Sequence, residues 1–291
     1  APPAQIINNA PADSIMLEAT SNELQVASGT YKTRLQLADP NSAPSIEFPT
    51  DLEHSMPAQA LNSLLDKVRF AAATADFQAV FRGIYLHFTP ARARAVATDG
   101  FRLAYYDVDP VPGLELEALV IAKNTIEISR AFPDGDVRVG IRNNRLALES
   151  DTTKLTVSLM DGQFPDYQRV IPTMFQANVT LEARTLVETL QRVALMSEKT
   201  ANNRVDLHLK SGRLTLSGEG QYGSAQEVLE VQHSGQADEL MLAVNAKFLT
   251  DAINAEGAIN LNLNQGNAAP MTIVDAEDPK YLSMLVPLRT T

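Results

Sequence analysis

The sequence of 291 residues contains neither cysteine nor tryptophan. Without cysteine the chain forms no disulfide, has no thiol nucleophile and offers no thiolate to a metal ion. No apolar run approaches the roughly 18–20 residues that a membrane-spanning helix requires. These absences are compatible with a reducing compartment, and we predict a cytoplasmic location.

Sequence signatures of catalysis are missing as well. There is no phosphate-binding loop, no glycine-rich dinucleotide turn, no His-Glu-x-x-His pair and no Gly-x-Ser-x-Gly elbow. The histidines occupy unrelated segments, and we interpret His54, His87, His208 and His233 as surface or strand residues. Asp134-Gly135-Asp136 lacks the later acidic ligands of a calcium loop, so it predicts a turn. We expect no enzyme activity, catalytic residue, metal site or cofactor.

The charge balance is strongly acidic. An excess of 35 acidic over 24 basic residues gives a net charge of −11. A chain of this charge has no bulk attraction to nucleic acid, so any contact with DNA requires a local basic surface. The hydrophobic content of 45% and the charged content of 20% indicate a globular protein of two or three domains.

A pattern of about 120 residues repeats along the chain, which is the length of a domain rather than of a solenoid unit. Residues 132–150 match residues 10–28 in their apolar, polar and turn positions. The helical pattern of 58–68 returns at 183–193. Ile121-Ala122-Lys123 corresponds to Asn245-Ala246-Lys247 at nearly the same shift. Several matches at one shift indicate duplicated domains.

Hydrophobic periodicity predicts the elements of the first two repeats. We expect a short helical segment over 5–9, a hairpin over 10–28, a strand over 31–37 and a proline-rich linker over 40–49. Helices are expected over 56–74 and 122–131, and strands over 80–88, 92–97, 101–108, 137–141, 146–149 and 155–160.

The order of helix, strands, helix, strands in each complete repeat predicts an α+β fold with antiparallel sheets and segregated helices. Residues 1–50 match only the second half of a repeat. By comparison with the other two repeats, we expect that about 70 N-terminal residues are lacking.

Residues Ala95–Tyr106 contain two apolar strand patterns separated by Thr98-Asp99-Gly100. Asp-Gly between such patterns predicts a hairpin, because glycine accepts the positive φ of a tight turn. The third repeat has Gly218-Glu219-Gly220 at the comparable place, without a following Arg-Leu-Ala. Because the hairpin sequence occurs in one repeat only, it indicates a site rather than a feature of the scaffold.

Three motifs follow one another along the chain: Ala97-Thr98-Asp99-Gly100-Phe101-Arg102-Leu103-Ala104, then Asp161-Gly162-Gln163-Phe164-Pro165-Asp166-Tyr167, then Val286-Pro287-Leu288-Arg289. Together they resemble the bacterial sliding clamps, the β subunits of the DNA polymerase III holoenzyme. That family has three copies of one domain per subunit, and two subunits close head to tail into a ring around duplex DNA.

The resemblance implies the DNA clamp fold, with antiparallel sheets outside and helices lining a central hole. It divides the chain into 1–50, the second half of a first clamp domain whose first half is lacking, then a second domain at 51–173 and a third at 174–291. It implies a non-catalytic processivity factor that encircles DNA and tethers its partners through a hydrophobic peptide-binding pocket. The partners implied are duplex DNA without sequence preference, the polymerase α subunit, the clamp loader, other polymerases, ligase, mismatch-repair proteins and a second copy of the chain. An alternative is a repeated α+β interaction module without ring closure or a DNA role.

Carried over by position, the resemblance assigns three groups of residues. The peptide pocket comprises Gln78, Val80, Phe81, Thr98, Gly100, Phe101, Arg102, Leu103, Pro165, Arg169, Val170, Asn245, Phe248, Ala268, Pro270, Val286, Pro287, Leu288 and Arg289. The DNA-facing cations are Lys67, Arg69, Lys123, Arg192, Lys199 and Lys247, all on or just beyond predicted helices. The dimer interface includes Leu35, Leu195 and Met196.

The sequence departs from the family pattern at several pocket positions. Phe101 stands where many clamps have histidine, and Gln78 stands where an arginine is familiar. Ala268 and Pro270 alter the second part of the pocket. We therefore expect peptide binding to persist with a changed preference.

Overall fold

The structure is a computed structural model, which describes residues 2–39, 42, 48–49, 51–75, 79–265 and 269–289. The chain divides into two compact units, Ala1–Phe48 and Pro49–Thr291. Most of the predicted linker at 40–49 lies outside the described residues. Among those residues no helix is long and apolar enough to cross a membrane.

The N-terminal unit contains a short helix and a three-stranded antiparallel sheet. Its elements are α1 (Pro2–Asn8), β1 (Met16–Ala19), β2 (Glu23–Ser28) and β3 (Tyr31–Gln36), with strand order β1-β2-β3. The predicted hairpin and third strand are confirmed. The hydroxyl of Ser28 donates to the carbonyl oxygen of Ser14 at 3.0 Å, which fixes the segment before β1 to the sheet.

The second unit begins with one complete repeat. Its elements are β4 (His54–Pro57), α2 (Ala58–Arg69), η2 (Ala79–Arg82), β5 (Gly83–Thr89), β6 (Arg92–Thr98), β7 (Arg102–Val108), β8 (Leu116–Ile121), η3 (Ala122–Asn124), α3 (Thr125–Ala131), β9 (Asp136–Arg142), β10 (Arg145–Glu149) and β11 (Lys154–Ser158). A connecting segment with the turn η4 (Tyr167–Val170) leads to the next repeat.

The next repeat has the same order, with one additional strand, β16. Its elements are β12 (Ala177–Glu182), α4 (Ala183–Val193), η5 (Lys199–Ala201), β13 (Arg204–Lys210), β14 (Arg213–Gly220), β15 (Gly223–Glu230), β16 (Gln232–Gly235), β17 (Glu239–Asn245), α5 (Ala246–Ala252), β18 (Ala258–Leu263), β19 (Met271–Asp275) and β20 (Tyr281–Leu285).

The strand orders confirm that the two repeats are equivalent. In the first repeat the sheets run β7-β6-β5-β8 and β11-β10-β9-β4. In the second repeat they run β15-β14-β13-β17 and β20-β19-β18-β12, so each strand of the first repeat has a counterpart in the second, and β16 is added beside β12. By the same comparison β1, β2 and β3 of the N-terminal unit correspond to β9, β10 and β11.

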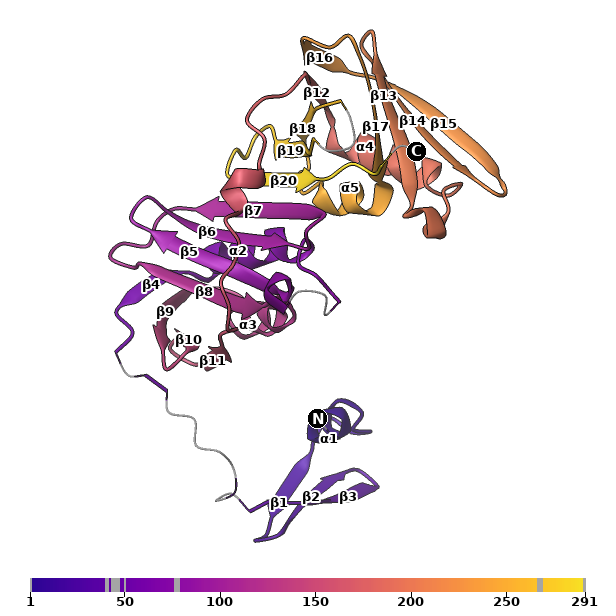
Figure 1. Cartoon of the computed structure of the whole chain (residues 1–291). Helices are drawn as coiled ribbons and strands as arrows, with labels where there is room; N and C mark the ends of the chain where they lie inside the picture. Colours follow the sequence, from indigo (N-terminus) through magenta and orange to yellow (C-terminus); the bar gives the residue numbers. More distant parts are fainter. Residues whose placement is uncertain are drawn as a thin grey trace. The chain divides into compact units, whose positions relative to one another are not determined.

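The two repeats share one sheet, because β20 of the second repeat pairs antiparallel with β7 of the first. Figure 1 shows these two strands side by side between the repeats. The hydroxyl of Ser283 donates to the carbonyl oxygen of Leu103 at 3.1 Å across this junction. The buried Tyr281 donates its hydroxyl to the carbonyl oxygen of Ala252 at 2.7 Å, which also ties β20 to α5.

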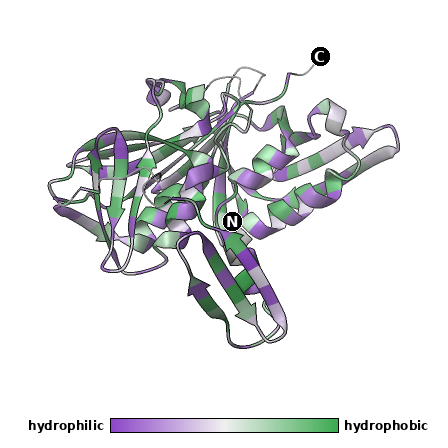
Figure 2. Ribbon diagram, turned by 90° about the horizontal axis from the view of Figure 1, so that it is seen from below, coloured by the Kyte–Doolittle hydropathy of each residue, from purple (hydrophilic) through white to green (hydrophobic). Residues whose placement is uncertain are grey.

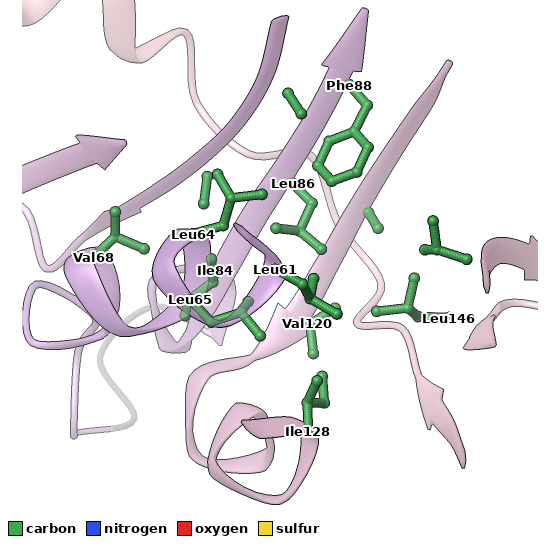
Figure 3. Close-up of a cluster of buried hydrophobic side chains, with 14 of the residues drawn as sticks. Leu61, Leu64, Leu65, Val68, Ile84, Leu86, Phe88, Val120, Ile128 and Leu146 are labelled. Atoms are coloured by element: carbon green, nitrogen blue, oxygen red, sulfur yellow. The ribbon is translucent and has the colours of Figure 1, made fainter. Parts of the chain in front are cut away.

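Each repeat has its own hydrophobic core between its sheets and its helices. Apolar and polar residues are interspersed along the helices and strands (Figure 2), and the apolar side chains of most of these elements gather in the core of their repeat. In the first repeat, side chains of α2 lie against those of β5, β8, α3 and β10 (Figure 3). Those labelled are Leu61, Leu64, Leu65, Val68, Ile84, Leu86, Phe88, Val120, Ile128 and Leu146. A smaller cluster joins Val96, Leu103, Leu119, Phe164, Tyr167 and Met284.

Some local predictions differ from the structure. The strands β4 and β8 were not expected: β4 has only four residues, and β8 has an almost continuous apolar run without alternation. The helix expected over 122–131 is a 3-10 turn followed by the short α3, where the hydroxyl of Thr125 donates to the carbonyl oxygen of Ala122 at 2.7 Å. Val80 and Phe81 lie in the turn η2 rather than in a strand.

Equivalent core positions should respond alike to the same truncation. Leu61 on α2 and Leu186 on α4 are both fully buried, so Leu61→Ala and Leu186→Ala should each reduce the free energy of unfolding by about 2–5 kcal/mol. The exposed Arg184→Ala should change it by less than about 0.5 kcal/mol. Urea unfolding measures all three variants. A loss under about 1 kcal/mol for either leucine would contradict the equivalence of the two cores.

Candidate functional site

The turn between β6 and β7 is held by a compact set of hydrogen bonds. The hydroxyl of Thr98 donates to the carbonyl oxygen of Arg102 at 2.7 Å and accepts from the amide of Gly100 at 3.1 Å. The carboxylate of Asp99 accepts from the amides of Phe101 and Arg102 at 2.9 and 3.0 Å. Gly100 has φ of +90°, a conformation that favours glycine, and a Cβ there would lie 3.5 Å from the ring of Phe81. The predicted hairpin is confirmed.

Arg102 connects this hairpin to α5. Its side chain is 10% exposed, with Nε 2.9 Å from Asp99 and Nη1 2.8 Å from Asp251. The guanidinium lies 4.2 Å from the ring centre of Phe248 and 5.5 Å from that of Phe70. Two carboxylates and two aromatic faces thus compensate the cation for its loss of water. Arg102 is therefore a buried contact between the hairpin and α5 rather than an exposed side chain.

The C-terminal tail runs from the hairpin to β17. The amide of Val286 donates to the carbonyl oxygen of Phe101 at 2.8 Å, and the amide of Leu288 donates to that of Ala243 at 2.7 Å. Pro287 is buried between these two bonds. The carbonyl oxygen of Arg289 accepts from Arg204 at 3.3 Å. The tail therefore touches both repeats of the second unit.

The segment between the repeats is fixed to the sheet by two aromatic residues. The ring of Phe164 stacks on Tyr85 with the centroids 5.1 Å apart. The hydroxyl of Tyr167 accepts from Arg94 at 3.4 Å, and Arg94 forms two 2.6 Å bonds to Asp107. Burial opposes the charge of Arg94, but the hydrogen bonds to Asp107 and Tyr167 raise its pKa above the usual value.

These anchors determine where the candidate residues of the connecting segment lie. Pro165, Arg169 and Val170 are exposed, and Arg169 pairs with Asp166 at 2.7 Å. Gly162 has φ of +118°, and a Cβ on it would lie 2.7 Å from Val80. The connecting segment thus lies against the turn that carries Val80 and Phe81.

The predicted pocket residues come from both repeats and from the tail, and Arg102 reaches from the first repeat to Asp251 and Phe248 of the second. Those of the first repeat and the connecting segment are Val80, Phe81, Thr98, Gly100, Phe101, Leu103, Pro165, Arg169 and Val170, and those of the second repeat and the tail are Asn245, Phe248, Val286, Pro287, Leu288 and Arg289. Phe101 is 66% exposed and Val170 is 52% exposed, whereas Leu103 is buried in the small cluster below. Asn245 caps α5 by accepting from the amide of Phe248 at 3.2 Å. Pro270 is half-buried, and Gln78 and Ala268 lie outside the described residues.

Two residues of this arrangement were absent from the predicted set: Phe70 and Asp251. Phe70 follows α2, and Asp251 lies on α5, 149 positions from Arg102. Local patterns carry no signal for a contact at that separation.

Most of the predicted DNA-facing cations have carboxylate partners within the chain. Lys67 lies 3.3 Å from Asp278, Arg192 lies 2.6 Å from Glu227, and Lys247 lies 2.9 Å from Asp251. Arg69 pairs with Asp66. The side chain of Lys199 is not described. Lys123 is exposed and forms no ion pair with any residue that the structure describes.

Two groups at these ion pairs, the Glu227 carboxyl and the Tyr106 hydroxyl, have shifted pKa values. Hydrogen bonding from Arg192 lowers the pKa of the Glu227 carboxyl, so this carboxylate stays charged near neutral pH. Lys67 also lies 4.5 Å from the ring centre of Tyr106. Burial, with the nearby Asp278 carboxylate, raises the pKa of Tyr106 to about 12. A phosphate that approaches Arg192 or Lys67 must compete with an existing partner.

The predicted interface residues occupy three different environments. Leu195 is 78% exposed and Met196 is 38% exposed, directly after α4. Leu35 is half-buried on β3. Among the described strands, β15 pairs only with β14 and β3 pairs only with β2, so each has an open edge.

Comparison with known proteins adds independent findings. The family model of the DNA polymerase III beta subunit, central domain, matches residues 55–166, and that of its C-terminal domain matches residues 168–289. The chain is 30% identical to the Beta sliding clamp of Caulobacter vibrioides over 236 residues, which is 78% of this chain and 63% of that protein. It is 27% identical to that of Pseudomonas aeruginosa over 96% of this chain and 78% of that protein.

The fold has a similar relative among solved structures. The DNA polymerase III beta subunit of Thermotoga maritima superposes with a TM-score of 0.88 at 25% identity, over 99% of this chain and 79% of that one. The two family models follow each other along the chain and together cover most of it. The chain therefore belongs to the family of bacterial DNA polymerase III beta subunits, the beta sliding clamps.

Proposed function

We propose that the chain is a DNA sliding clamp, a non-catalytic processivity factor that surrounds duplex DNA and tethers a DNA polymerase to it. The observation that carries this function is the β7–β20 junction, which joins equivalent repeats edge to edge in one sheet. A protein assembled from repeated junctions of this kind can enclose its ligand, so that topology rather than affinity retains it. We propose a cytoplasmic location for the chain.

Ring closure would use the same kind of junction between two copies. The strand β3 corresponds to β20, and β15 corresponds to β7, so β3 of one copy should pair with β15 of the other. Because the two edges differ, the contact is heterologous and leads to a closed ring or an open array. We place the domain boundaries at 51–173 and 174–291, with 1–50 as the second half of a further domain.

The DNA-facing surface is proposed to lie on the helices. Among the predicted DNA-facing cations whose side chains the structure describes, Lys123 alone is exposed and has no carboxylate partner. The ion pairs of Arg192 and Lys247 reduce the net field that a phosphate meets. Weak, salt-sensitive contacts of this kind allow a protein to move along DNA without sequence preference.

The peptide site is proposed to take a short hydrophobic motif from a polymerase α subunit, the clamp loader or a repair protein. The exposed Phe101 and Val170 offer apolar surface, and the half-buried Phe248 adds an aromatic edge. The exposed Arg169 would orient the peptide. Phe101 extends the apolar surface, which favours an aromatic or aliphatic anchor at that point.

The dimer should depend on Leu195 and Met196. Exchange of both for alanine should convert a dimer into a monomer and leave the free energy of unfolding within about 0.5 kcal/mol, because both side chains are exposed. Analytical ultracentrifugation measures the mass, and Met241→Ala, exposed on β17, is the matched control. A monomeric parent chain, released equally from circular and linear DNA, would favour the interaction module without ring closure.

Freeing Arg192 should strengthen the contact with DNA. Glu227→Gln removes its charge partner, so the affinity for duplex DNA should rise by about two- to threefold and the salt dependence should steepen by close to one ion. Fluorescence anisotropy against salt concentration gives both quantities. Glu149→Gln is the control, since Glu149 pairs with Lys154 and Arg138 on the sheet. Equal effects of both variants would argue against α4 as the DNA-facing element.

The tail should be required for peptide binding. A peptide with a leucine and a phenylalanine anchor should bind at micromolar strength, and truncation after Leu285 should weaken it at least about tenfold. The amide of Val286 and the buried Pro287 would be lost from the site, while β20 remains complete. Isothermal titration measures the affinity, and circular dichroism verifies the fold. Unchanged affinity in a folded, truncated chain would exclude this location of the pocket.

A further inference from the structure

We propose that Asp251 is a positioning residue of the peptide site, and that Lys247 competes with Arg102 for its carboxylate. The inference rests on the proposed peptide-binding function and adds a control to it. The exposed Lys247 and the buried Arg102 share the carboxylate of Asp251, so a change in the bonding of Lys247 alters the bonding of Arg102 at the peptide site.

The geometry of the shared carboxylate carries this inference. The Oδ2 atom of Asp251 lies 2.8 Å from Nη1 of Arg102 and 2.9 Å from Nζ of Lys247. Lys247 also lies 3.0 Å from Oδ1, so it contacts both oxygens. The Lys247 side chain is 67% exposed, and that of Arg102 only 10%. Water, a salt anion or a phosphate can therefore bind the ammonium group of Lys247, whereas the guanidinium of Arg102 is much less accessible to them.

Arg102 transmits the effect because its neighbours form the site. Its backbone belongs to the hairpin whose Phe101 carbonyl oxygen holds the tail through Val286. Its guanidinium lies against the ring of Phe248 on α5. A firm Arg102–Asp251 bond keeps hairpin, tail and α5 in one arrangement, and such preorganisation improves affinity because less ordering remains to be done on binding.

The competition determines the sign of the effect. When Lys247 binds a phosphate group, Asp251 keeps Arg102 as its cationic partner, and the peptide site becomes better ordered. DNA and peptide should then strengthen each other's binding, because coupling between two sites is reciprocal. Residues of a merely structural ion pair would behave differently: neutralising either partner would weaken the site.

The first repeat supplies matched controls for the charge changes. Lys123 corresponds to Lys247, and Glu127 corresponds to Asp251 in the aligned repeats. Glu127 pairs with Arg130 at 2.8 Å on the surface of α3, where both side chains are mostly exposed. Arg130→Gln and Glu127→Gln thus remove one positive and one negative charge of an exposed ion pair without touching the bonds of Arg102.

The experiment measures the affinity of a fluorescein-labelled peptide with leucine and phenylalanine anchors for the parent chain and its variants. Asp251→Asn should weaken binding about tenfold, Lys247→Gln should tighten it about threefold, and the double variant should match Asp251→Asn within about twofold. Lys247→Arg should restore the parent affinity. Arg130→Gln and Glu127→Gln should stay within about twofold of the parent.

A second titration in the presence of duplex DNA tests the coupling. DNA should tighten the peptide about threefold in the parent chain and in Lys247→Arg, but not in Lys247→Gln. Weaker binding for both Lys247→Gln and Asp251→Asn, or equal shifts in the control variants, would overturn the inference. So would peptide affinity of the parent chain that is independent of DNA. A parent chain that does not bind the peptide at all would instead contradict the proposed function.

Discussion

The pairing of β7 with β20 is the constraint on which the rest of the structure depends. These strands belong to different repeats, and their backbone hydrogen bonds make one sheet of nine strands out of two separate halves. Because the register is fixed, Leu285 faces Arg102, and the chain leaves the sheet at the tip of the hairpin. Tail, hairpin and α5 meet for this reason.

A buried cation at this junction needs several partners. Arg102 could not lose its water without Asp99, Asp251 and the two aromatic rings beside it. These partners allow a charged residue to occupy the buried start of β7, directly after the exposed Phe101. This arrangement also separates two roles: Phe101 presents surface, and Arg102 holds that surface in position.

The electrostatics of the helices fit a chain with a net charge of −11. Arg192 and Lys247 are balanced by carboxylates on neighbouring positions of the fold rather than gathered into a free basic patch. Under the proposed function, a ring around DNA would need only weak attraction to it, since enclosure prevents escape. In the coupling proposed above, Asp251 would link a surface cation to the proposed peptide site through Arg102.

Much of the architecture could be predicted from the sequence because duplication leaves repeated local patterns. The hairpin at Thr98-Asp99-Gly100, the helical patterns at 58–68 and 183–193, and the strands β5, β6 and β7 were expected from turn chemistry and periodicity. The short β4 and the non-alternating β8 were not expected, because they are recognised as strands only by their pairing with β9 and β5.

The sequence by itself determined the repeat, the α+β class and the family, because these depend on residue order and local spacing. Only the tertiary structure decided which residues meet at the candidate site. Asp251 and Phe70 are remote from Arg102 in the chain, and nothing in their local patterns marks them. A shared sheet and a buried charge brought them together, and both depend on packing between segments rather than on the segments themselves.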